Sequence, residues 1–231
     1  YVYHEGWHPP NNYTLSPDGS VRGVFFRDIH KCNPELQEFI DRNKPKNVDS
    51  KYEKHKPATT DYKMDAIRFA YKICAKTHLM LDCDYDYVFW VDADIAFKKT
   101  ISERDVIRKF LPEDCAISFI DRPSYYSECG FVGYNLTNKH TQKFVKELRN
   151  YYEQDLLFNE NQWHDSFVWN RVREKYLSGQ QQLDLKGRRK DGYVWPESKI
   201  EPYTAHLKGK LKKDAGVDEI DKKVNKGDYN D

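Results

Sequence analysis

The sequence predicts an α/β fold in which a mostly parallel central sheet is flanked by helices. Apolar, strand-like segments alternate along the chain with segments of helical periodicity, an order of elements typical of α/β proteins. One segment, residues 87–91, is apolar along nearly its whole length, as expected of a strand buried on both faces of a parallel sheet. The sequence contains no internal repeat and no linker-like segment. We therefore expect one domain over residues 1–213 and a charged tail over residues 214–231.

The first elements are read from strand and capping signals. Residues 1–3 have the pattern of a strand already under way, so we expect an upstream strand before the sequence begins. Residues 21–26 are predicted to form a short buried strand. A helix is predicted over residues 33–42, because its Asn-Pro start supplies a cap and a favourable first turn. Residues 44–60 are polar and lack periodicity, which predicts a loop.

The later elements follow from periodicity. Residues 61–76 are predicted to be helical, because apolar residues three or four positions apart fall on one face. Ser102 and Asp105 have the spacing of a capping box and predict a short helix after them. The remaining predictions are strands over residues 115–120 and 130–134, and helices over residues 139–151 and 165–176.

Composition excludes several classes of function. The 231 residues carry a net charge of +1, so no global field favours nucleic acid or an anionic membrane as the partner. No apolar run is long enough for a transmembrane helix, and the start has no signal-peptide pattern. The cysteines are odd in number and scattered, which favours a reducing, cytoplasmic environment over a disulfide framework or a zinc site. They are Cys32, Cys74, Cys83, Cys115 and Cys129.

The most specific feature for function is the pair Asp92 and Asp94, which directly follows the apolar run of residues 87–91. Ligands of open α/β sheets bind beyond the carboxyl ends of the strands. Residues two apart in an extended chain point the same way, so both carboxylates can reach one ion. Carboxylate oxygens suit Mg²⁺ or Mn²⁺. The alternative is a pair of acidic turn residues that cap Lys98 or Lys99.

The segment Phe89-Trp90-Val91-Asp92-Ala93-Asp94 resembles the DxD motif of GT-A type, metal-dependent nucleotide-sugar glycosyltransferases. Residues 65–72, 127–135 and 206–210 resemble three further segments of that family, in the expected order. The resemblance implies a GT-A-like, Rossmann-like domain. It also implies that Asp92 and Asp94 hold Mn²⁺ or Mg²⁺ against the diphosphate of a nucleotide-sugar donor. The acceptor could be a glycan, a lipid, a protein or a small molecule.

Further site residues follow from the same resemblance. His206 would be the third metal ligand, and the segment after it would meet phosphate. Arg68 and Lys72 lie one helical turn apart and could touch one ligand, although they could equally be ordinary surface charges. The lysines near His206 could likewise be a solvated strip. The residues predicted to bind the donor are Asp65, Arg68, Lys72, Lys208, Gly209 and Lys210.

An inverting transfer needs a carboxylate that takes the proton of the acceptor hydroxyl. Asp165 is the preferred base and Glu128 the second choice, although Asp165 can also be interpreted simply as a helix N-cap. A retaining transfer would not need that base in the same position. Tyr125, Tyr126 and Trp163 could stack on sugar rings, whereas Trp195 is predicted to belong to the core.

Other functions fit parts of the same pattern. A haloacid-dehalogenase-like phosphatase also places DxD after an apolar strand, with the first Asp as nucleophile. Ala96, however, stands where that family usually has Thr or Val, and no later acidic pair follows a predicted strand to complete that family's metal site. A nucleotidyltransferase would normally show a Gly-rich phosphate loop near its start. A module that binds a nucleotide sugar or glycan without turnover is the non-enzymatic alternative.

Overall fold

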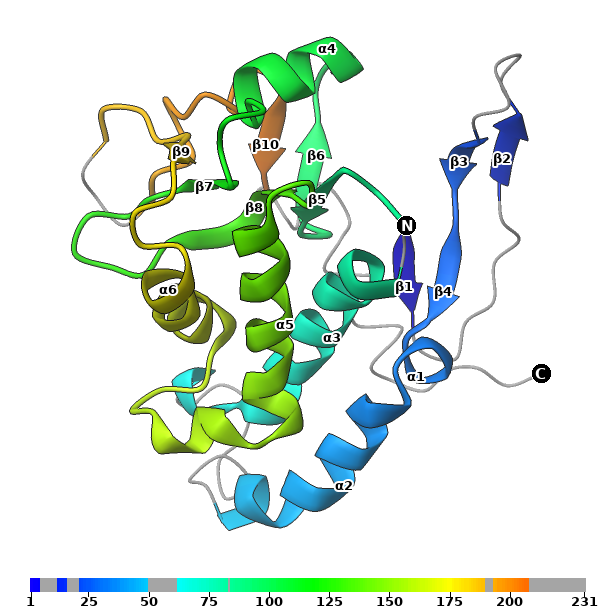
Figure 1. The fold of residues 1–231 in the computed structure, drawn as a ribbon, viewed down its shortest axis with the longest axis vertical. Helices are drawn as coiled ribbons and strands as arrows, with labels where there is room; N and C mark the ends of the chain where they lie inside the picture. Colours follow the sequence, from blue (N-terminus) through cyan, green and yellow to red (C-terminus); the bar gives the residue numbers. More distant parts are fainter. Residues whose placement is uncertain (5–11, 16–20, 50–61, 83, 190–192, 208–231) are drawn as a thin grey trace. The chain divides into compact units, whose positions relative to one another are not determined.

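The computed structural model describes residues 1–4, 12–15, 21–49, 62–82, 84–189 and 193–207 of the 231-residue chain (Figure 1). The chain divides into two compact units, and each unit is made of two separate stretches of sequence. Unit 1 comprises residues 1–86 and 136–178. Unit 2 comprises residues 87–135 and 179–231. None of the helices in the described ranges combines the length and apolarity needed to cross a bilayer.

Unit 1 is mainly helical. Helix α3 (Ala66–Asp82) packs against α2 (Pro34–Asp49) and α5 (Lys139–Glu153), and α5 also packs against α6 (Asp165–Tyr176). Strands β1 (Val2–His4) and β4 (Phe26–Asp28) pair in parallel, and β2 (Asn12–Leu15) pairs antiparallel with β3 (Val21–Val24). The short helices are α1 (Ile29–Cys32), η2 (Tyr62–Met64) and η4 (Leu156–Asn159).

The core of unit 1 forms where apolar faces of the helices meet. Along α5, Phe144, Leu148 and Tyr152 recur every four residues and are fully buried, which is the pattern of an amphipathic helix facing a core. Phe144 meets Trp169 of α6 edge-on, with ring centroids 5.8 Å apart. Tyr152 lies against Phe39 of α2 at 5.7 Å. These aromatic contacts join α2 and α6 to α5.

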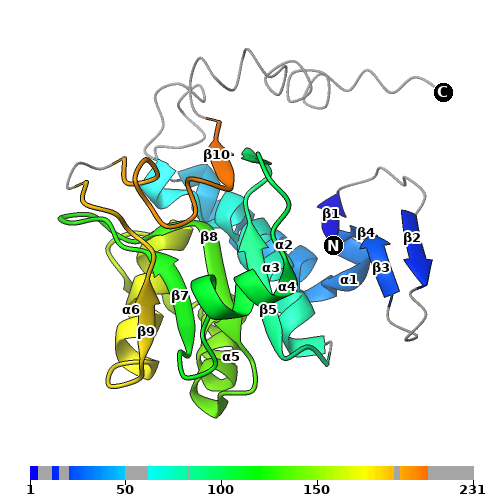
Figure 2. The same ribbon diagram turned by 90° about the horizontal axis from the view of Figure 1, so that it is seen from above.

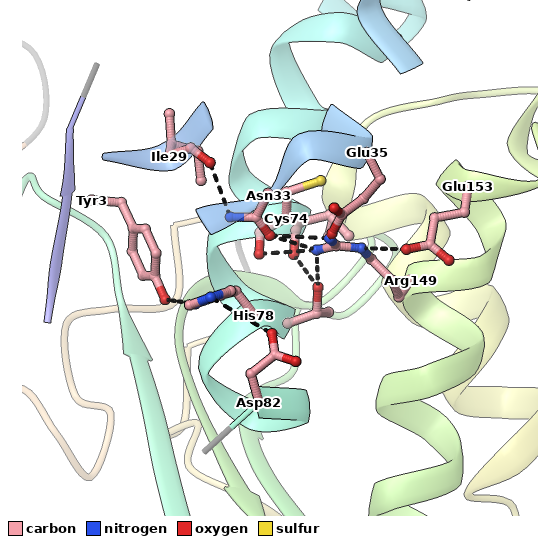
Figure 3. Close-up of polar contacts among 11 residues, drawn as sticks. Tyr3, Ile29, Asn33, Glu35, Cys74, His78, Asp82, Arg149 and Glu153 are labelled. Atoms are coloured by element: carbon pink, nitrogen blue, oxygen red, sulfur yellow. Dashed lines mark hydrogen bonds and ion pairs between the residues drawn. The ribbon is translucent and has the colours of Figure 1, made fainter. Parts of the chain in front are cut away.

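A buried cation lies within this helical core (Figure 3). Arg149 of α5 has a side chain only 5% exposed, and burial lowers the pKa of its guanidinium. A buried charge is costly unless it is paired and hydrogen-bonded. Here the guanidinium contacts several polar groups at once. They are Asn33 Oδ1 at 3.0 Å, the Cys74 carbonyl at 3.2 Å, Thr77 Oγ1 at 3.0 Å, Glu153 at 2.9 Å, and Glu35.

Unit 2 is built on a four-stranded sheet in the order β5-β8-β7-β9 (Figure 2). These strands are β5 (Tyr87–Val91), β8 (Glu128–Asn135), β7 (Ile117–Ile120) and β9 (Gln182–Asp184). A second, two-stranded sheet pairs β6 (Ile95–Phe97) antiparallel with β10 (Thr204–His206). The short helix α4 (Glu103–Asp105) runs into the π-helical turn η3 (Val106–Phe110).

The prediction of a single Rossmann-like, GT-A-like domain with a mostly parallel central sheet is wrong. Strand β8 runs antiparallel to both β5 and β7, and only the β7–β9 pair is parallel. The β7–β8 connection covers only residues 121–127, whereas parallel pairing needs a crossover of about a dozen residues or more. Strand β5 is an outer strand of the sheet, and only Val88 among its residues is buried.

The core of unit 2 gathers apolar residues from β6, η3, β7, β8 and the segment after β9. It comprises Ile95, Phe110, Ile120, Phe131, Leu185, Val194, Trp195 and Ile200. The prediction that Trp195 belongs to the core is confirmed, since only 2% of it is exposed. Ile95, the first residue of β6, belongs to this core. The predicted metal ligands lie next to it, because Asp94 directly precedes β6 and His206 pairs with Ile95.

Several predicted elements match the structure. The strand over residues 87–91 and the helix over residues 165–176 are confirmed at both ends. The Ser102–Asp105 capping box is also confirmed, because the Asp105 amide donates to Ser102 Oγ at 3.1 Å. The predicted loop over residues 44–60 is helical as far as Asp49, where α2 ends. Residues 50–60 and the predicted tail over residues 214–231 lie outside the described residues.

Candidate functional site

The turn that follows β5 positions both aspartates of the DxD segment. The Asp92 amide donates to the Gly130 carbonyl of β8 at 2.8 Å, which extends the β5–β8 pairing by one residue. The Ile95 amide donates to the Asp92 carbonyl at 3.0 Å and closes the turn. Strand β6 then leads away and pairs with β10, beside it in Figure 1. Backbone pairing therefore fixes the DxD segment from both sides.

The same pairing brings His206 to Asp94. His206 pairs with Ile95 in the β6–β10 register, and the Leu207 amide donates to the Asp94 carbonyl at 2.8 Å. His206 Nε2 consequently lies 3.4 Å from Asp94 Oδ1. The imidazole is 4% exposed and packs against the Trp195 ring, with centroids 4.8 Å apart. Its Nδ1 is buried without a hydrogen-bond partner among the described residues.

Asp92 and Glu128 approach each other at Gly130. Trp90 donates its indole N–H to Asp92 Oδ1 at 2.5 Å, and the Gly130 amide donates to Glu128 Oε1 at 3.2 Å. A Cβ at position 130 would lie 3.3 Å from Glu128 Oε1 and 3.4 Å from Asp92 Oδ2. The missing side chain of Gly130 therefore leaves space between these two carboxylates.

Glu128 also has a cationic neighbour. Arg122 Nη1 lies 3.5 Å from Glu128 Oε2, and the two side chains are 21% and 13% exposed. The guanidinium compensates part of the cost of holding this carboxylate in a mostly buried position. Glu128 therefore has one oxygen held by the backbone of β8 and the other facing Arg122.

The atoms available here to bind a metal ion are carboxylate oxygens and one imidazole nitrogen. Such ligands suit a hard divalent cation. The space beside Gly130 and the buried His206 Nδ1 are further signs of a polar site. Within the described ranges, no three His, Cys, Asp or Glu side chains form a closed metal-binding group. Mg²⁺ is typically held by one or two carboxylates together with water and substrate phosphates, so a closed protein cage is not required.

The other predicted base, Asp165, lies in unit 1 at the start of α6. It is 5% exposed, and its Oδ2 lies 2.8 Å from Lys72 Nζ of α3. Burial alone would raise the pKa of Asp165. The attraction of Lys72, Lys76 and His164 outweighs burial and lowers the pKa to about 2. Asp165 and Lys72 are therefore partners in a buried ion pair.

Asp165 is not the N-cap of α6. That role belongs to His164, whose Nδ1 accepts from the Phe167 amide at 3.4 Å. Asp65 does have a capping contact in the structure, since its Oδ1 accepts from the Arg68 amide at 3.0 Å at the start of α3. Arg68 is exposed, with its guanidinium 5.8 Å from the centre of the Phe69 ring.

The predicted site residues thus fall into two groups. Unit 2 holds two pairs, Asp94 with His206 and Asp92 with Glu128, and the two aspartates are linked by the turn between β5 and β6. Unit 1 holds Asp65, Arg68, Lys72 and Asp165. Lys208, Gly209 and Lys210 lie outside the described residues.

Sequence reasoning missed three neighbours of these groups. Trp90 lies two residues before Asp92, so the period of a strand could have indicated that it shares a face with that carboxylate. Lys76 lies one helical turn after Lys72, and this spacing could have indicated its place beside Asp165. Arg122 lies in the β7–β8 connection, and no local pattern points from it to Glu128.

No protein-family model matches this sequence, and no curated protein matches it either. The resemblance to metal-dependent glycosyltransferases therefore stays a prediction from the segments quoted above.

Proposed function

We propose that the protein transfers a glycosyl group from a nucleotide-diphosphate sugar to an acceptor, with Mn²⁺ or Mg²⁺ held by Asp92 and Asp94. The observation that carries the proposal is that the two aspartates of the DxD segment each lie near another predicted site residue in unit 2. His206 Nε2 lies 3.4 Å from Asp94 Oδ1, and a Cβ at Gly130 would lie 3.3 to 3.4 Å from oxygens of Glu128 and Asp92. Mostly buried carboxylates such as Glu128 and Asp94 are costly unless a cation or a hydrogen-bond donor compensates their charge, and a bound metal ion would do so.

The roles of the chain's residues follow from their contacts. Asp92, Asp94 and His206 would hold the cation, which as a Lewis acid would stabilise negative charge on the diphosphate leaving group. Trp90 fixes the orientation of Asp92 through its indole N–H, and Trp195 packs against the His206 ring. Neighbours that fix the orientation of a ligand are a general feature of metal sites.

The carboxylate best suited to take a proton from the acceptor hydroxyl is Glu128. An efficient general base has a pKa near the working pH, and a pKa of about 2 makes Asp165 a weak base. Glu128 lies beside Asp92 at Gly130, within unit 2. We assign the base role in an inverting transfer to Glu128, and we assign Asp165 the role of holding Lys72 in place.

The test combines binding with turnover. Thermal unfolding is measured with UDP-, GDP-, CMP- and dTDP-linked sugars, each with and without Mn²⁺, because a ligand that binds only the native state raises the melting temperature. Metal-dependent release of free nucleotide is then followed with the donor that binds. We expect a Mn²⁺-dependent shift with one nucleotide class, and its loss in Asp94→Asn and His206→Ala.

The matched control is Glu201→Gln, which removes a carboxylate of unit 2 that is 44% exposed and paired with Lys98. This variant should behave like the wild type. Donor binding without nucleotide release would favour a non-catalytic binding module. A phosphoryl-enzyme formed on Asp92 would favour a phosphatase. Mn²⁺ dependence that is unchanged in both site variants would contradict the proposed ligand set.

A further inference from the structure

The connection between β7 and β8, residues 121–127, has a defined geometry next to the proposed base. In both ribbon views this green segment loops out beyond the ends of the two strands (Figures 1 and 2). The Tyr125 amide donates to the Arg122 carbonyl at 2.9 Å and forms a tight turn. Ser124, inside that turn, has a φ of 65°, a left-handed conformation that is uncommon for a residue other than glycine. Such strained residues persist only where the surroundings hold them, and they often mark ligand-binding loops.

Arg122 supplies much of that support. Its Nε donates to the Tyr126 carbonyl at 2.5 Å, and its Nη2 donates to the Ser127 carbonyl at 3.3 Å. Its Nη1 lies 3.5 Å from Glu128 Oε2. A single guanidinium therefore ties the second half of the loop to the proposed base.

The first residue of the loop is also fixed. The Asp121 amide donates to Asp184 Oδ1 at 3.1 Å, and Lys186 Nζ lies 3.1 Å from Asp121 Oδ2. The loop is thus anchored to β9 at one end and to Glu128 at the other. An anchored loop loses little conformational freedom when it binds a ligand.

This loop presents one aromatic side chain to solvent. Tyr125 is 65% exposed, more than any other large hydrophobic side chain identified as exposed in the described part of the chain. Its ring carries a flat apolar face and a polar hydroxyl, and it has few torsions to fix on binding. A sugar ring has matching features, with an apolar C–H face and a rim of hydroxyls.

We propose that the acceptor is a carbohydrate whose ring stacks on Tyr125, with Arg122 positioning the loop so that an acceptor hydroxyl reaches Glu128. This inference rests on the proposed function and names the acceptor class for the same site. A membrane lipid would require a contiguous apolar patch, whereas the loop that carries Tyr125 also contains the charged residues Asp121 and Arg122, which form ion pairs with Lys186 and Glu128. A single ring also offers far less area than a specific protein–protein interface.

The first experiment measures acceptor binding without turnover. Saturation-transfer NMR is recorded with the methyl glycosides of glucose, galactose, mannose and N-acetylglucosamine. We expect signals on the ring C–H protons for at least one glycoside with the wild type, their loss in Tyr125→Ala, and their return in Tyr125→Trp. Phe97→Ala is the matched control, because Phe97 is another exposed aromatic of unit 2, 56% exposed, that lies outside the loop.

The second experiment measures transfer to the glycoside that binds. Tyr125→Ala should raise the acceptor KM about tenfold, in line with the loss of one aromatic stacking contact. Metal-dependent release of nucleotide in the absence of acceptor should stay unchanged, because the Tyr125 side chain is 65% exposed and the proposed metal ligands lie on other segments.

The possible failures can be told apart. If nucleotide is released but the wild type and Tyr125→Ala bind the glycoside equally well, this inference is overturned. The proposed function would still stand. Absence of any glycoside signal with the wild type would also overturn it. If glycoside binding depends on Tyr125 but no nucleotide sugar releases its nucleotide, the proposed function is overturned. The carbohydrate-binding site at Tyr125 would still stand.

Discussion

The indole nitrogen of Trp90 lies 2.5 Å from Oδ1 of Asp92, which is two residues later in the sequence and directly follows β5. This short hydrogen bond fixes the first carboxylate of the DxD segment. The second carboxylate, Asp94, is instead held near His206 by the pairing of β6 with β10. The two aspartates are thus oriented by different parts of unit 2, although only one residue separates them in sequence.

Trp90→Phe is expected to weaken Mn²⁺ binding about tenfold with little change in fold, because loss of a hydrogen bond that orients a metal ligand has effects of about this size. Electron paramagnetic resonance of free Mn²⁺ measures the affinity directly. Trp163→Phe is the control, since the Trp163 indole N–H donates to the Glu160 carbonyl at 3.3 Å within unit 1. Equal affinity losses in both variants would contradict a specific role for the Trp90 hydrogen bond.

Gly130→Ala is expected to lower Mn²⁺ affinity about tenfold while the unfolding free energy stays near the wild-type value. The new Cβ would lie 3.3 Å from Glu128 Oε1, which must shift slightly, and it would fill the space beside Asp92 Oδ2 at 3.4 Å. Gly133→Ala provides the contrast, because its Cβ would lie only 2.5 Å from Ser118 Oγ and 2.6 Å from Phe89 Cε1. Overpacking of this kind should cost about 2 kcal/mol in urea unfolding. A stability loss in Gly130→Ala as large as in Gly133→Ala would argue against a site-specific effect.

Asp165→Asn is expected to destabilise the protein by about 3 kcal/mol at pH 7, because it leaves Lys72 and the buried Lys76 without their shared carboxylate. The folded pKa of about 2 lies below the ordinary 3.8. Ionisation of Asp165 therefore stabilises the fold above pH 3.8, and this contribution of about 2 kcal/mol is lost as the pH falls toward 2.

Urea unfolding of both proteins between pH 7 and pH 2 checks this expectation. The difference in stability between wild type and Asp165→Asn should shrink as the pH falls through that range. A difference that stays constant down to pH 2 would mean that the charge of Asp165 does not stabilise unit 1. Glu201→Gln, which removes an exposed carboxylate, should change stability by less than about 1 kcal/mol.

Arg149→Met is expected to destabilise the protein by about 3 kcal/mol, because it removes the buried partner of Glu35 on α2, Thr77 on α3 and Glu153 on α5. Lys98→Met is the control for loss of a cation, since Lys98 and Glu201 are both more than 40% exposed and such pairs contribute at most about 1 kcal/mol. Urea unfolding at pH 7 compares the two. A loss in Arg149→Met no larger than in Lys98→Met would show that the buried guanidinium has no special structural role.

The sequence predicted individual elements better than their arrangement. Hydrophobic periodicity located α3, α5 and α6, and the apolar run located β5 at both ends. The direction of the strands was wrong, because side-chain patterns report burial and carry no information about which way a neighbouring strand runs. The length of the β7–β8 connection was the available signal for antiparallel pairing.

The candidate site was partly predictable for a similar reason. Asp92 and Asp94 were found because they directly follow a recognisable strand. The contact of His206 with Asp94 depends on the β6–β10 register, and short strands of three residues give almost no periodic signal. The ion pair of Asp165 with Lys72 joins two helices far apart in sequence, so its low pKa could not be deduced from either segment.

The division of the chain has a consequence for its synthesis. The polypeptide passes from one unit to the other after Asp86, after Asn135 and after Ser178. Neither unit can therefore complete its native contacts before residues beyond Asn135 have been synthesised. Helices α5 and α6, which complete unit 1, emerge only after most of the four-stranded sheet has been made. Folding during translation is thus interleaved, and a fragment that ends near residue 86 should be prone to aggregation because its apolar helix faces lack their partners.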